Sequence, residues 1–109
     1  MSRFTIATYK PDTDDPKNHE ALRDLIAQHH MTLKMEGLAT SRPSLFLHAD
    51  DGTFLEIFEW ANDEAAAAAH TNERVQALWA KMGEVASFPA LADVAGCDRP
   101  FPHFAPVRL

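Results

Sequence analysis

The fold is decided by residues 44–60, SLFLHADDGTFLEIFEW, which have the pattern of two strands joined by a tight turn. Asp50-Asp51-Gly52 predicts the turn, because aspartate and glycine tolerate the positive φ angles that a tight hairpin connection requires. The flanking runs, residues 44–49 and 53–60, are rich in β-forming side chains. We therefore expect them to pair as antiparallel strands.

Both strands of this hairpin carry apolar side chains on both faces. Successive side chains of a strand point to opposite sides, so the apolar residues fall into two sets. These are Leu45, Leu47, Leu55 and Ile57 on one side, and Phe46, Phe54, Phe58 and Trp60 on the other. An antiparallel sheet in a monomer usually leaves one face to water. Because the helices of so short a chain can cover only one face, we expect the other to meet a second copy in a twofold homodimer.

On the N-terminal side of the hairpin, the sequence predicts a strand and a long helix. Residues 3–9 are rich in β-forming side chains and end at Lys10-Pro11-Asp12, which favours a turn. Residues 16–36 have the apolar period of an amphipathic helix, at Leu22, Leu25, Ile26 and Leu33. Gly37 supplies the glycine that commonly follows the end of a helix.

After the hairpin, the sequence predicts a second helix in two pieces. Asn62 is a good N-cap, and the alanines at 65–69 continue the helix. Thr71-Asn72 favours a bend or a restart, because such side chains compete for backbone hydrogen bonds. The second piece carries one apolar face, at Val75, Leu78, Trp79, Met82 and Ala86.

The C-terminal part of the chain predicts a short strand and an arm. Residues 88–94 are expected to form a fourth strand, which Pro89 restricts to a sheet edge or a strand start. The Pro-rich residues 99–109 are expected to form an extended C-terminal arm. Its apolar residues Phe101, Phe104 and Val107 are candidates to lie across the partner subunit.

The expected order of elements is β, α, β, β, α, β, with both helices in crossover positions. This order predicts an α+β fold of ferredoxin-like βαββαβ topology with an antiparallel sheet. The 109 residues, 46% of them hydrophobic, suit a single domain over residues 1–109. With the second sheet face paired to a partner, the assembly expected is a dimeric α/β barrel.

Composition excludes several classes of partner and compartment. The 16 acidic and 10 basic residues give a formal net charge of −6, and the basic residues are scattered, so nucleic acid is not an expected partner. No apolar run approaches the roughly 20 residues that cross a bilayer, and none resembles a signal sequence. With a single cysteine the chain cannot form an internal disulfide. We expect a cytoplasmic protein with no membrane contact.

Two histidines are candidates for acid–base chemistry. His29 falls within the apolar stripe of the first helix, where a polar ring must find a hydrogen-bond partner. It is either a satisfied core histidine or an imidazole that faces a cavity and moves a proton near neutral pH. His70, at the expected break of the second helix, is either a capping or surface residue or a second catalytic candidate at a pocket wall.

Five further side chains are candidates to contact a small molecule: His30, Glu56, Phe58, Trp60 and Trp79. Glu56 shares the strand face of Phe58 and Trp60, and an inward carboxylate is a candidate base with a raised pKa. The alternative is that the aromatic residues are core and that Glu56 lies at a rim or interface. We predict no metal and no cofactor, since the chain has no HExxH, CxxC, GxSxG or glycine-rich phosphate loop.

The stretch FLEIFEW at 54–60, followed by ANDEAA, His70 and the aromatic helix through Val75 and Trp79, resembles the antibiotic-biosynthesis-monooxygenase-like (ABM-like) group of dimeric α/β barrels. The resemblance implies oxygenation of polycyclic phenols or quinols without metal or flavin, with relatives that degrade haem or catalyse small isomerisations. His29 or His70 would be the base, and Phe58, Trp60 and Trp79 would hold the ring. The haem-degrading branch has an asparagine on the first strand, where this chain has none, so haem chemistry is not expected.

These observations leave three functional hypotheses. The first is a cofactor-independent monooxygenase-like or isomerase-like enzyme acting on a small aromatic or enolisable molecule. The second is a non-catalytic module that binds a small apolar or aromatic molecule in the same cavity. The third is a metal site built from His29, His70 and a carboxylate.

Overall fold

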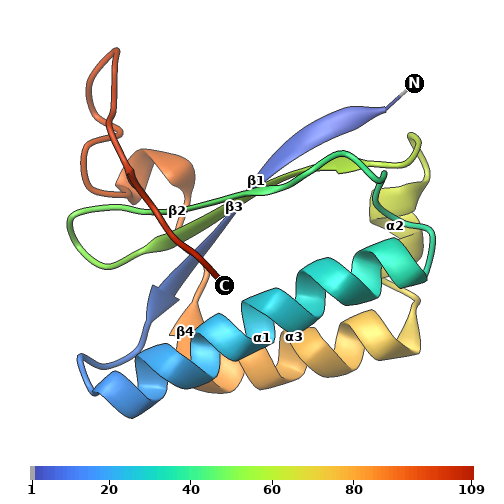
Figure 1. Ribbon diagram of the computed structural model, residues 1–109, viewed down its shortest axis with the longest axis horizontal. Coiled ribbons are helices and arrows are strands. Elements are labelled where there is room, and N and C mark those ends of the chain that lie inside the picture. The colour runs from blue at the N-terminus through green and yellow to red at the C-terminus, as the bar shows by residue number, and fades with distance from the viewer. Residues whose placement is uncertain (1) are drawn as a thin grey trace.

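The computed structural model describes residues 2–109. The strands are β1 (Arg3–Pro11), β2 (Leu45–His48), β3 (Phe54–Trp60), β4 (Ala86–Ser87) and β5 (Ala105–Pro106). The helices are α1 (Pro16–Met35), α2 (Ala65–Ala69) and α3 (Glu73–Val85), with one 3₁₀ turn, η1 (Leu91–Asp93). The strands form one antiparallel sheet in the order β4-β1-β3-β2-β5. Figure 1 shows α1 and α3 together beneath one face of this sheet, which makes the fold a compact α+β architecture.

The predicted hairpin is confirmed. Leu47 pairs with Leu55 and Phe46 with Glu56, and Gly52 adopts a φ of 88° in the turn. This register sends Phe46 and Glu56 toward the helices and Leu47 and Leu55 to the opposite face, because side chains alternate along each strand.

Helix α1 follows its sequence signals. The Asp15 side chain accepts a hydrogen bond from the Lys17 N–H, and Gly37 follows the end of the helix with a φ of 72°. The buried positions repeat at helical spacing, at Leu22, Ile26, His29 and Leu33. This stripe packs against the sheet and α3, so it supplies much of the core.

The break in the second helix is also where the sequence indicates it. Helix α2 ends at Ala69, and the Asn72 side chain caps α3 by accepting hydrogen bonds from the N–H groups of Arg74 and Val75 at 3.0 and 3.1 Å. The prediction that Asn62 is the N-cap of the second helix is wrong. Its side chain accepts from the Glu64 N–H within a preceding turn, and the helix begins at Ala65.

The predicted strand at residues 88–94 is wrong. Strand β4 is limited to Ala86–Ser87, which pair with Pro11 and Lys10, and residues 91–93 form the 3₁₀ turn η1. Pro89 has no N–H to continue a strand ladder, and its carbonyl accepts a hydrogen bond from the Thr8 hydroxyl instead. Because β4 is so short, most of the adjacent edge of β1 has no strand beside it.

The C-terminal arm differs from its prediction in part. Ala105–Pro106 form the edge strand β5 against β2, and the Val107 N–H donates to the Phe46 carbonyl at 2.8 Å. Phe104 packs against a small buried cluster that contains Leu55 and Val94. Phe101 remains 79% exposed, so only part of the predicted arm extends away from its own chain.

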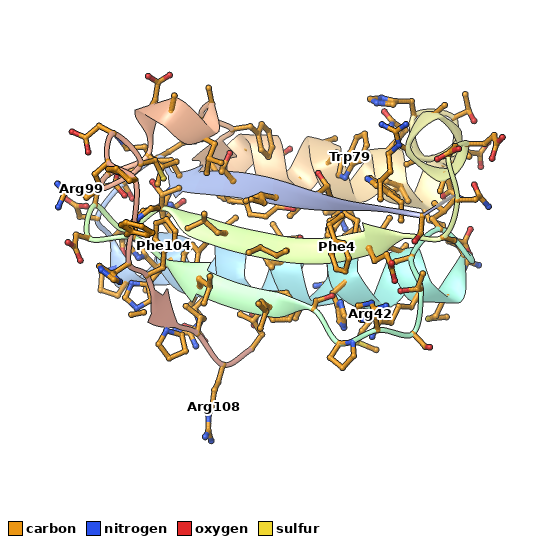
Figure 2. The ribbon with its side chains drawn as sticks, turned by 90° about the horizontal axis from the view of Figure 1, so that it is seen from above. Phe4, Arg42, Trp79, Arg99, Phe104 and Arg108 are labelled. Atoms are coloured by element: carbon orange, nitrogen blue, oxygen red, sulfur yellow. The ribbon has the colours of Figure 1, made fainter. Side chains whose placement is uncertain are left out.

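The sheet face opposite the helices is covered at one end only. The segment after β4 rises over this face beside the β2–β3 hairpin (Figure 1), where Val94 and Phe104 cover Leu55. At the other end Phe4, Ile6 and Leu45 are 59%, 45% and 58% exposed. Figure 2 views this face and shows Phe4 standing on it.

Candidate functional site

The central feature of the interior is a histidine–carboxylate pair. His29 lies on the buried stripe of α1, and Glu56 lies on the helix-facing side of β3. Their side chains are 3% and 0% exposed, and His29 Nδ1 is 3.0 Å from Glu56 Oε1. A polar pair this deep in the core is stabilised only if both groups are hydrogen-bonded.

Two more side chains complete the network from two further elements. The Trp79 indole on α3 donates a hydrogen bond from Nε1 to His29 Nε2 at 3.0 Å. The Tyr9 hydroxyl on β1 donates to Glu56 Oε1 at 2.7 Å. Two helices and two strands therefore contribute to one chain of hydrogen bonds.

The donors and acceptors of this network fix the tautomer of His29. An indole N–H can only donate, so the Nε2 atom that receives it is an acceptor and carries no proton. The imidazole proton is therefore on Nδ1 and is donated to Glu56. This is the arrangement by which a carboxylate orients a histidine base and stabilises the imidazolium that forms when the base takes a proton.

Tyr9 and Glu56 are both buried. Burial raises the pKa of the Tyr9 hydroxyl well above its usual value, and the Glu56 charge and hydrogen bond raise it further. Tyr9 therefore stays a protonated donor at neutral pH. Glu56 Oε2 is buried and has no hydrogen-bond partner within residues 2–109.

A cavity of about 380 Å³ adjoins the network. It lies beside the edge of β1 that the short β4 leaves free, on the side facing α3, and Figure 2 shows Trp79 near this edge with α3 behind it. The lining is mainly apolar and aromatic, as expected for a small-molecule site. The lining residues are Thr5, Ile6, Ala7, Thr8, Tyr9, His29, Phe58, Trp60, Trp79, Phe88 and Pro89.

Four of the residues predicted from sequence meet at this cavity. His29, Phe58, Trp60 and Trp79 all contribute to its wall. Phe58 packs edge-on against Trp60, with ring centres 4.9 Å apart, and against His29 at 6.0 Å. Glu56 lies behind His29 rather than in the wall, so it can act on a ligand only through the imidazole.

His70 and His30 lie outside the cavity wall. His70 is exposed at the end of α2, and its ring packs against Trp79 at 5.1 Å. His30 is within 2.9 Å of the Ser44 hydroxyl and packs on Phe46, beside a separate hollow between α1, β2 and the C-terminal residues. Burial and the nearby Lys34 lower the pKa of His30.

Sequence reasoning missed Tyr9 and the other β1 residues in the wall. The signal that could have found them is the alternation of Thr5, Ala7 and Tyr9, which all face the helices when β1 pairs with β3 in the observed register. Phe88 and Pro89 are not predictable as wall residues, because the sequence pattern predicts a strand over residues 88–94, where the structure has a loop and the turn η1.

In the part of the chain that the structure describes, no group of three or more His, Cys, Asp or Glu side chains could hold a metal ion. The hypothesis of a site built from His29, His70 and a carboxylate thus has no ligand set among residues 2–109. None of the helices in the same range has the length and apolar character needed to cross a membrane.

No protein-family model matches the chain, and no curated protein matches it.

Proposed function

We propose that this protein is a cofactor-independent enzyme, monooxygenase-like or isomerase-like, that removes a proton from a small aromatic or enolisable molecule. The observation that carries the proposal is His29, whose Nδ1 is 3.0 Å from a buried carboxylate and whose ring contributes to the wall of an apolar cavity. His29 is the proposed base. Glu56 is its positioning residue, and Phe58, Trp60 and Trp79 hold the substrate ring.

The proposed first step is the same for both reaction types. The bound molecule displaces the Trp79 indole N–H from His29 Nε2. His29 Nε2 then takes a proton from a carbon or hydroxyl of the bound molecule, and the resulting imidazolium is stabilised by Glu56. In an isomerisation the proton returns to a different carbon of the substrate. In an oxygenation the substrate carbanion reduces dioxygen and combines with it to form a hydroperoxide, whose O–O bond then breaks with loss of water, so that one oxygen stays on carbon as a carbonyl and dioxygen is the oxidant. The apolar wall keeps water from reprotonating the anion in either reaction.

We also propose a ferredoxin-like topology and a twofold dimer for this protein. The order β4-β1-β3-β2, with α1 and α3 in the two crossovers, supports a ferredoxin-like topology. The exposed Phe4, Ile6 and Leu45 support pairing of the helix-free face with a second copy, as in a dimeric α/β barrel. Both features agree with the ABM-like resemblance of residues 54–79.

A second candidate is a non-catalytic module that binds a small apolar molecule. One observation favours it: His29 Nε2 is already bonded to Trp79 at 3.0 Å, so the imidazole is satisfied without a substrate. The two candidates differ in what His29 is needed for. An enzyme needs it for turnover, whereas a binding module needs it only for affinity.

The test compares the wild-type protein with two variants, His29→Gln and His30→Gln, on one panel of molecules. Thermal unfolding of the wild-type protein against quinols, anthrones and enolisable lactones identifies a ligand that raises the midpoint, and oxygen uptake and product formation are then measured with it. His29→Gln should lower turnover by at least about 100-fold, the usual effect of losing a general base, while the ligand still raises its midpoint.

His30→Gln is the matched control, because His30 is the neighbouring residue but lies at a different hollow. It should keep the wild-type turnover. Turnover that survives in His29→Gln would rule out His29 as the base. A ligand that binds with no turnover in any variant would favour the binding module.

A further inference from the structure

The hydrogen bonds around His29 all run in one direction. Trp79 Nε1 donates to His29 Nε2, His29 Nδ1 donates to Glu56 Oε1, and Tyr9 donates to the same oxygen. Glu56 Oε1 is the end of the chain and accepts twice. On the cavity side of the network, His29 Nε2 is therefore a hydrogen-bond acceptor, which the Trp79 indole N–H occupies.

We infer that Glu56, through the tautomer it imposes on His29, makes the cavity select molecules that donate a hydrogen bond, and that the Trp79 indole N–H holds the position a ligand donor would take. The inference rests on the proposed ligand-binding role of the cavity and goes beyond it by assigning the specificity to Glu56.

Two independent contacts fix the acceptor. The indole N–H requires a lone pair on Nε2, and the carboxyl oxygen of Glu56 requires a proton on Nδ1. The result does not depend on the charge of Glu56, because a proton on the unpartnered Oε2 would leave Oε1 free to accept. Tyr9 reinforces the arrangement, since burial keeps its hydroxyl protonated and therefore a donor.

Trp79 is the member of the network that can be displaced. Tyr9, His29 and Glu56 are 4%, 2% and 0% exposed, whereas Trp79 is only partly buried and lines the cavity. Among the described residues its ring also contacts His70, at the protein surface, and packs against the edges of both core clusters, so a ligand needs to shift the indole N–H only, without removing the ring from the core. A ligand hydroxyl that replaces the indole restores the lost hydrogen bond, but an ether or carbonyl oxygen would face the Nε2 lone pair and leave a buried acceptor unpaired.

The inference is tested with a matched pair of ligands, 2-naphthol and 2-methoxynaphthalene, which share a ring system and differ in the donor. Binding is measured by calorimetry near neutral pH. Trp79→Phe removes the competing indole and leaves His29 Nε2 without its partner, so this variant should bind the naphthol several-fold more tightly than wild type does. We expect Trp79→Phe to prefer the naphthol by at least about tenfold, the effect of leaving one buried acceptor unpaired. Wild type should show a smaller preference, because its indole can stay bonded to Nε2 when the ether binds.

Glu56→Leu in the Trp79→Phe background is the decisive variant. Leucine has no acceptor for the Nδ1 proton, so the imidazole is free to carry its proton on Nε2, which turns the acceptor into a donor. The preference should then fall below about threefold or reverse. Nitrogen-15 spectra of His29 give a readout independent of ligands: Nε2 should be unprotonated in wild type and protonated in the double variant.

Equal affinity of Trp79→Phe for the two naphthalenes, or a protonated Nε2 in neutral wild-type His29, would overturn the inference and leave the cavity proposal standing. Failure of both molecules to bind would overturn the inference together with the ligand-binding role. A clear preference for the naphthol without turnover in any assay would support the inference. That result would count only against the proposed enzymatic activity.

Discussion

At the residue scale, the tyrosine absorbance of the protein comes from one buried residue, because Tyr9 is the single tyrosine of the chain. Its hydroxyl is buried and donates to Glu56, and burial raises its pKa well above the usual value. An unfolded tyrosine ionises at about pH 10. We predict that the phenolate absorbance of the native protein stays low through that pH and rises only when the chain unfolds. In urea the same absorbance should rise at about pH 10.

The pH dependence of stability follows from the same shift. A group whose pKa is raised on folding stabilises the protein fully below its unfolded pKa, and this contribution is lost as the pH rises toward the folded pKa. The free energy of unfolding should therefore fall above about pH 10, because the unfolded chain alone ionises there. Urea titrations from neutral pH upward measure it.

Tyr9→Phe is the control for this prediction. It should cost about 1–3 kcal/mol at neutral pH, because Glu56 loses one of its two donors in the core. The variant should also lack the part of the alkaline loss that comes from Tyr9. An identical alkaline slope in the two proteins would show that Tyr9 titrates normally.

Part of the residue network could be predicted from sequence. A histidine among Leu22, Ile26 and Leu33 requires a partner, and the parity of β3 places Glu56 inward, so each half of the pair is predictable. Their contact is not, because it depends on how α1 crosses the sheet. The hydrogen bond from Trp79 to His29 has no signal in the sequence either, since it joins residues 50 positions apart.

At the element scale, the start of α3 depends on Asn72. Its side-chain oxygen accepts from Arg74 and Val75, and its amide donates to Glu36 at 2.9 Å, which ties the start of α3 to the end of α1. We predict that Asn72→Ala lowers the free energy of unfolding in urea by about 1–2 kcal/mol.

Asn62→Ala is the matched control, because Asn62 accepts only within a turn before α2 and does not cap a helix. Its effect should be less than half that of Asn72→Ala. Equal losses from the two variants would mean that the Asn72 cap adds nothing beyond an ordinary turn.

Local signals explain which elements were predictable. The hairpin at Gly52, the helical period of α1 and the Asn72 cap are each set by a few neighbouring residues. Strand β4 is different, because Ala86–Ser87 follow α3 without a loop and are strand only through pairing with Lys10 and Pro11. That pairing is long-range, so the sequence placed the strand too late and missed the free edge beside the cavity.

At the scale of the whole molecule, the exposed end of the helix-free face is an apolar surface patch. Phe4, Ile6 and Leu45 stand on it, and Arg42 lies over the Phe4 ring at 5.5 Å (Figure 2). Arg42 also donates to Glu59, whose pKa is lowered by hydrogen bonds from Ser2, Arg42 and Thr40. An apolar patch with a charged rim is typical of a protein interface.

We predict that sedimentation gives a molecular mass twice the 12.1 kDa of one chain, and that Ile6→Lys converts the protein to a monomer. Ile6 is 45% exposed on the patch, and burying an unpaired ammonium in an apolar interface is strongly unfavourable. The association constant should fall by at least about 100-fold, measured by sedimentation velocity across a dilution series. Met35→Lys is the control, because Met35 is 72% exposed but lies on α1, beneath the other face of the sheet (Figure 1). A monomeric wild type, or equal weakening by both substitutions, would rule out this face as the dimer interface.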